Sequence, residues 1–151
     1  MERYRKANKS VQYGQVVFAG SSLMEMFPIN KLLKEHDDDD TIIYNRGSGG
    51  FVTWELMGVR IYLTAYYPVN FEAASESMKE CLKIRTNEKI NAANAEVEKL
   101  AKRHGQKYND VNEKLKDEQG RLKAEYTIEG MHIYESGHRA IYEDVMKYVR
   151  E

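Results

Sequence analysis

The stretch Val16-Val17-Phe18-Ala19-Gly20-Ser21-Ser22-Leu23 decides the fold. Val16 to Ala19 is a short apolar, β-branched run that ends in a glycine and two serines. Such a run predicts a buried strand that leads into a turn. A serine at a strand-to-helix turn exposes its Oγ at the carboxyl edge of the sheet, with backbone N–H groups around it. A serine pair after a strand is also a common helix cap, so this stretch alone leaves a structural role open.

Three more runs predict strands, and three helical patterns lie between or after them. The strand runs are Thr41–Arg46, Val59–Tyr67 and Gln106–Val111. The helical patterns cover about 27–34, 76–104 and 136–150, with Gly105 ending the second and Ser136 as the N-cap of the third. Strands that alternate with helices indicate βαβ units and a mainly parallel sheet covered on both faces. Ligands bind at the carboxyl ends of such strands.

Length and composition narrow the class of protein. The chain has 151 residues, of which 42% are hydrophobic, and this predicts a single domain over residues 1–151. A formal net charge of −1 argues against a nucleic-acid partner. We expect no signal peptide and no membrane span, because every apolar run is too short, and the simplest location is the cytoplasm. The single Cys81 excludes an internal disulfide and a cysteine metal cluster, and the run Asp37–Asp40 is interpreted as a solvated loop.

Two further segments carry chemistry. Asn45-Arg46-Gly47-Ser48-Gly49-Gly50 follows the second predicted strand, and its glycines would let backbone N–H groups approach a ligand oxygen. Glu129-Gly130-Met131-His132 precedes the last helix and offers a carboxylate and a base that can meet on one side of a turn. The other histidines, His36, His104 and His138, are interpreted as surface residues.

Together and in this order, the three segments resemble the SGNH (GDSL-type) hydrolases, a family of esterases and acylhydrolases. Ser22 matches the nucleophile of that family, and Gly50 matches the glycine whose N–H helps to bind the oxyanion. The segment from Glu129 to His132 resembles the Asp-x-x-His block, with His132 as the base. The resemblance covers most of the chain, from about Val16 to Val149.

The resemblance implies a fold, an activity and a set of site residues. The fold would be a flavodoxin-like three-layer α/β/α arrangement with a mainly parallel sheet. The activity would be that of a serine hydrolase on a small ester, through an acyl-enzyme on Ser22 with His132 as base and Glu129 as its orienting carboxylate. The N–H groups of Ser22 and Gly50 would form the oxyanion hole. No metal and no cofactor would be needed, and the partner would be a small-molecule ester.

The sequence departs from the family pattern at two places. Glu129 stands where the family has aspartate, and either carboxylate can accept the imidazole hydrogen bond. The Gly-x-Asn-Asp block, whose Asn donates into the oxyanion hole, does not occur between Gly50 and Val59. The sequence therefore predicts a sheet shortened by one central βα unit, around Met57-Gly58.

Several alternatives follow from the missing unit. Val59–Tyr67 could take the vacated place beside the first strand, giving the strand order 2-1-3-4, or a second chain could fill it in a homodimer. Whether the chain keeps its activity is also open, since loss of one oxyanion donor costs on the order of 10²–10³ in turnover.

The alternative function is a non-catalytic SGNH-like domain with a binding role. A flavodoxin-like cofactor binder is a weaker alternative, because the glycines follow the second strand rather than the first.

Overall fold

The computed structural model of the chain describes residues 7–12, 15–47 and 62–150. The chain divides into two compact units, Met1–Met57 and Gly58–Glu151. Gly50, the Met57-Gly58 position of the predicted missing unit, and the first residues of the predicted third strand lie outside the described residues. In the described part of the chain, no helix is both long and apolar enough to cross a membrane.

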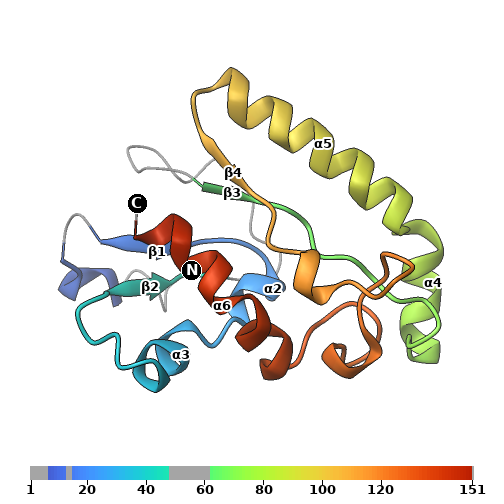
Figure 1. Cartoon of the computed structure of the whole chain (residues 1–151), viewed down its shortest axis with the longest axis horizontal. Coiled ribbons are helices and arrows are strands. Elements are labelled where there is room, and N and C mark those ends of the chain that lie inside the picture. Colours follow the sequence, from blue (N-terminus) through green and yellow to red (C-terminus); the bar gives the residue numbers. More distant parts are fainter. Residues whose placement is uncertain (1–6, 13–14, 48–61, 151) are drawn as a thin grey trace. The chain divides into compact units, whose positions relative to one another are not determined.

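In its described residues, the N-terminal unit has one pair of parallel strands, two short α-helices and one 3₁₀ helix. Its elements are η1 (Asn8–Ser10), β1 (Val16–Phe18), α2 (Ser22–Glu25), α3 (Ile29–Glu35) and β2 (Ile43–Asn45). β1 and β2 pair in parallel, with Val16 opposite Ile43 and Phe18 opposite Asn45 (Figure 1). The core of this unit consists of apolar side chains from α3, β2 and the segment before α3: Phe27, Ile29, Leu32, Leu33 and Ile43. Burial of these side chains fixes the place of α3 against β2.

The C-terminal unit holds a second parallel pair and the long helices. Its elements are β3 (Tyr62–Thr64), α4 (Glu76–Ile84), α5 (Asn87–Arg103), β4 (Lys107–Asn109), η3 (Glu113–Leu115), η4 (Ala124–Tyr126) and α6 (Glu135–Val149). β3 pairs with β4, and Figure 1 shows α5 running beside this pair, against which it packs. α6 packs against η3 and η4 and buries one stripe of side chains, among them Ile141, Tyr142 and Val145.

Each of the four predicted strand regions contains a strand of three residues, and the strands form two parallel pairs. The chain is therefore a mixed α/β protein with short parallel sheets. The order 2-1-3-4 and the three-layer arrangement would join the two units, and they stay predictions. The single domain over residues 1–151 stays a prediction as well.

All three predicted helices differ in their bounds, and the first begins at Ile29 rather than Phe27. The pattern over 76–104 forms two helices, because the Thr86 hydroxyl caps a new helix by accepting a hydrogen bond from the Lys89 N–H at 3.3 Å. α5 ends at Arg103, and Gly105 follows with a φ of +62°, as the glycine stop predicts. The last helix begins at Glu135, so Ser136 lies inside its first turn and is not the N-cap.

Candidate functional site

Ser22 is the first residue of α2, four residues after β1 ends. Ser21 precedes it with an extended backbone, and the Ser21 carbonyl accepts hydrogen bonds from the N–H groups of Met24 at 3.1 Å and Glu25 at 3.0 Å. The Ser22 N–H therefore lies at the N-terminal end of the helix. The Ser22 side chain is half-buried. This is the strand-to-helix turn that the sequence predicts for a nucleophile.

The segment after β2 lies directly against α2. The Asn45 Nδ2 donates to the carbonyls of Met24 at 2.8 Å and Phe27 at 2.9 Å, and its Oδ1 accepts from the Gly47 N–H at 2.9 Å. Gly47 is buried, and a Cβ there would lie only 2.1 Å from the Glu25 nitrogen. The close approach thus requires glycine at this position. Asn45 and Gly47 fix where the predicted oxyanion segment begins, whereas Gly50 itself lies outside the described residues.

Glu129 and His132 meet in the loop before α6. The Glu129 Oε1 lies 2.7 Å from the His132 Nδ1 and also accepts the His132 backbone N–H at 3.0 Å. Both side chains are mostly buried, with 18% of Glu129 and 22% of His132 exposed. A carboxylate on Nδ1 favours the tautomer that carries its proton there, which leaves Nε2 as the acceptor that a general base needs. The two residues that the sequence pairs are therefore in contact, in a geometry suited to a base.

The backbone around this pair is tightly held. Gly130 has a φ of +95°, and a Cβ there would lie 2.6 Å from the Asn70 carbonyl oxygen. The Gly130 carbonyl accepts the Asn70 N–H at 2.8 Å, and Met131 packs against a buried cluster that includes Val69. The loop that carries the pair is thus fixed on the core of its own unit.

Sequence reasoning missed two residues that shape this loop. Asn70 is buried, and its Nδ2 donates to the Leu122 carbonyl at 2.7 Å while its Oδ1 accepts the N–H groups of Glu72 and Ala73. Thr127 is also buried, and its hydroxyl bonds within the loop. The available signal was the preference of Asn and Thr for turns, where their side chains bond to nearby backbone.

The prediction that His138 lies at the surface is wrong. His138 is on α6 and only 2% exposed, because it shares the buried stripe of Ile141 and Tyr142. Burial lowers the pKa of His138 to about 4, although the Glu135 carboxylate acts in the opposite direction. His36 and His104 are exposed, as predicted. Across the described residues, no group of three or more His, Cys, Asp or Glu is placed to hold a metal ion.

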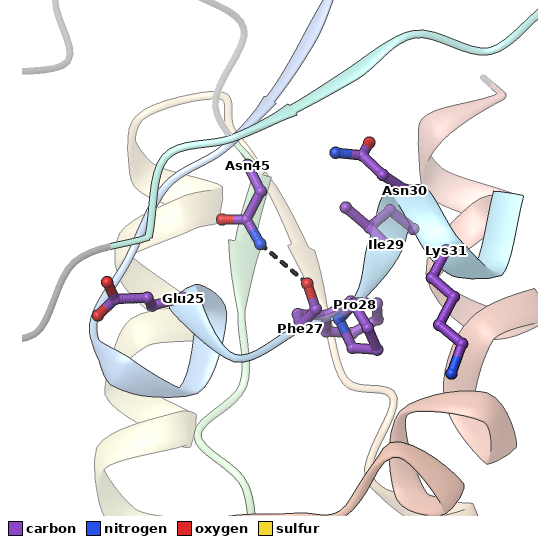
Figure 2. Close-up of a pocket in the computed structure, with 7 residues that line it drawn as sticks. All are labelled: Glu25, Phe27, Pro28, Ile29, Asn30, Lys31 and Asn45. Carbon is purple, nitrogen blue, oxygen red and sulfur yellow. Dashed lines mark hydrogen bonds between the residues drawn. The ribbon is translucent and has the colours of Figure 1, made fainter. Parts of the chain in front are cut away.

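A pocket of about 220 Å³ lies in the N-terminal unit, between the end of α2 and the start of α3. Figure 2 shows its lining, in which Asn45 donates to the Phe27 carbonyl across one side. Glu25 and Lys31 lie at its margins, and Ser22 is not part of the lining. The pocket is therefore separate from the predicted nucleophile.

Comparison with solved structures supports the fold. A Streptococcus pneumoniae structure, provisionally named as a platelet activating factor, is 25% identical to this chain with a TM-score of 0.80. The match covers 98% of this chain and 90% of that chain. A provisionally named acylhydrolase from Bacteroides fragilis is 16% identical with a TM-score of 0.71, over 99% of this chain and 95% of its own. A GDSL-like lipase from Bacteroides thetaiotaomicron is 15% identical with the same TM-score, over 99% and 96%. No family model and no curated protein matches the chain. The chain thus has the fold of GDSL-like hydrolase structures.

Proposed function

We propose that the chain is a serine hydrolase that cleaves a small ester through an acyl-enzyme on Ser22. The observation that carries this proposal is the 2.7 Å contact between the Glu129 Oε1 and the His132 Nδ1. A carboxylate–imidazole pair held by a loop that is anchored on the core is the arrangement that makes an imidazole an effective base beside a serine. The fold shared with acylhydrolase and lipase structures supports the same activity.

The proposed reaction has two steps. The His132 Nε2 takes the proton of the Ser22 hydroxyl as Oγ attacks the ester carbonyl, and the N–H groups of Ser22 and Gly50 stabilise the oxyanion. When the tetrahedral intermediate collapses, the alkoxide leaves with the proton from His132. Water then attacks the acyl-enzyme by the same route and releases the acid. Glu129 keeps the imidazole in the required tautomer and orientation.

The proposal requires that Ser22 and His132 share one sheet edge. We propose a flavodoxin-like three-layer fold that lacks the central unit carrying the Gly-x-Asn-Asp block. β3 would then lie beside β1 in the order 2-1-3-4, or a strand from a second chain would fill that place. Without the Asn donor, the site keeps only backbone donors for the oxyanion. Esters with good leaving groups, such as aryl acetates, need less of this stabilisation and would be the better substrates.

A second candidate function is non-catalytic binding of an ester-like ligand. The specific observation that favours it is the absence of a Gly-x-Asn-Asp block from the sequence between Gly50 and Val59. Such a domain would keep the Glu129–His132 pair as a structural contact. It would bind its ligand without forming an acyl-enzyme.

Kinetics on aryl acetates distinguish the two functions. We expect measurable hydrolysis by the wild-type chain, and Ser22→Ala and His132→Ala should each remove nearly all of it. The double variant should lose no more than either single variant, because the two residues act as a unit. His104→Ala is the matched control, since it removes an exposed imidazole from the same unit and should keep the wild-type rate. A Ser22→Ala variant with the wild-type rate would favour the binding function.

A further inference from the structure

The Thr127 hydroxyl bonds to both halves of the loop that carries the Glu129–His132 pair. Thr127 is 5% exposed, and its Oγ1 accepts the Gly130 N–H at 2.8 Å. The same hydroxyl donates to the His132 carbonyl at 2.9 Å. A buried hydroxyl that donates one hydrogen bond and accepts another has its orientation fixed, so it constrains both groups it touches.

These two bonds lie on either side of the catalytic contact. Gly130 directly follows Glu129, and the His132 carbonyl belongs to the residue whose ring meets Glu129. The Ile128 N–H donates to that same carbonyl at 2.9 Å, and Thr127 and Ile133 form an isolated antiparallel bridge that closes the loop. The hydroxyl therefore sets the spacing between the two backbone positions from which the carboxylate and the imidazole extend.

We propose that Thr127 is a positioning residue for the proposed hydrolase, and that it acts by holding the Glu129 Oε1 on the His132 Nδ1. The role of Thr127 in catalysis rests on the proposed function. The contact itself does not depend on activity, so it can be measured separately.

The loop has other anchors that should keep it folded when the hydroxyl is removed. The Asn70 N–H holds the Gly130 carbonyl, and Met131 packs against the cluster of Val69, Leu82 and Ile90. These anchors hold the middle of the loop. They do not replace the two hydrogen bonds that the hydroxyl makes to the Gly130 N–H and the His132 carbonyl. Removal of the hydroxyl should thus misalign the pair rather than unfold the unit.

The test compares Thr127→Val, which removes the hydroxyl at nearly constant shape, with Thr127→Ser, which keeps it. In Thr127→Val we expect kcat for an aryl acetate to fall about 10- to 100-fold while KM changes little, because a small misplacement of a base is costly. Thr127→Ser should keep kcat within about threefold, since the same two bonds can form. The matched control is Thr86→Val, which loses the capping hydroxyl of α5 and should leave kcat unchanged.

A second readout is the far-downfield proton NMR signal of an imidazole N–H held by a carboxylate, assigned by its loss in His132→Gln. We expect Thr127→Val to weaken or remove this signal and Thr127→Ser to keep it. If the wild-type chain lacks activity but the signal follows this pattern, the positioning role stands and the proposed function fails. If Thr127→Val keeps both the signal and kcat, the positioning role is contradicted. Thr127→Ala removes the hydroxyl without a new buried methyl, and it replaces the valine variant if that one does not fold.

Discussion

Glu129 shows how one carboxylate oxygen can satisfy both the backbone and the ring of the same histidine. Its Oε1 accepts the His132 N–H and contacts the His132 Nδ1. The family that the sequence resembles has aspartate at this position, and glutamate is one methylene longer. The spacing of three residues brings the two groups together here because the loop turns at Gly130, where the backbone has a positive φ.

The carboxylate predicts a graded effect of substitution at position 129. Glu129→Gln keeps the shape but can stabilise the wrong imidazole tautomer, so kcat should fall on the order of 10³–10⁴-fold. Glu129→Asp keeps the charge and should retain much more activity than the glutamine variant. Steady-state kinetics with an aryl acetate measure both effects. Equal rates for wild type and Glu129→Gln would rule out an orienting role.

His138 makes the stability of the fold depend on pH. Its pKa is about 4 in the folded chain, against an ordinary value near 6.5, because burial disfavours the charged ring. Between these values the unfolded chain binds a proton that the folded chain does not, so the free energy of unfolding decreases as the pH falls from about 6.5 to 4. The total loss should be about 3 kcal/mol.

Denaturant unfolding at several pH values checks this prediction. His138→Gln removes the titrating group, and its free energy of unfolding should change less with pH over the same window, whatever its absolute stability. His36→Gln is the control, because that ring is exposed and its loss should leave the pH dependence intact. A wild-type slope that His138→Gln does not flatten would assign the pH dependence to other groups.

At the scale of elements, periodicity and turn residues located the described strands and the long helices. Apolar runs located β1, β2 and β3, a weaker run located β4, and Gly105 marked the end of α5. The break between α4 and α5 was not predicted, and the Thr86 side-chain cap marks it in the structure. His138 could have been found, since its spacing to Ile141 places it on the buried stripe of α6.

The loop before α6 depends on glycine at position 130 for two separate reasons. Gly130 has a φ of +95°, and a Cβ would also collide with the Asn70 carbonyl oxygen and with Ala74. Gly120 has a similar φ of +74° but no atom within 4 Å of a Cβ. Gly120→Ala should therefore lower the free energy of unfolding by only about 1–2 kcal/mol, the cost of a positive φ for alanine. Gly130→Ala should lower it by more, because the Cβ also collides with its neighbours.

Thermal and denaturant unfolding of the two alanine variants measure this difference. Gly130→Ala should also reduce aryl-acetate hydrolysis, because the backbone between Glu129 and His132 must shift. Gly120→Ala should leave hydrolysis unchanged. Equal destabilisation by the two substitutions would show that the close approach at Gly130 is relieved at no cost.

At the scale of the whole molecule, the pairing of strands within each unit followed from the βαβ pattern, whereas the relation between units did not. Parallel pairing of β1 with β2 and of β3 with β4 is what alternating strands and helices predict. Which strand lies beside β1 depends on contacts distant in sequence, and local sequence patterns do not report such contacts. The residues of the proposed site are divided between the two units. Ser22 belongs to the N-terminal unit, and the Glu129–His132 pair belongs to the C-terminal unit.

The central claim is that Ser22 becomes a nucleophile because His132 activates it, which requires the two units to assemble one site. Labelling with a fluorophosphonate probe, followed by peptide mapping, tests this claim most directly, since the probe reacts only with an activated serine. We predict a single covalent adduct on Ser22 in the wild-type chain, and none in His132→Ala, while His104→Ala should be labelled like the wild type. An unlabelled Ser22 in the folded wild-type chain, or equal labelling of Ser22 in His132→Ala, would contradict the account.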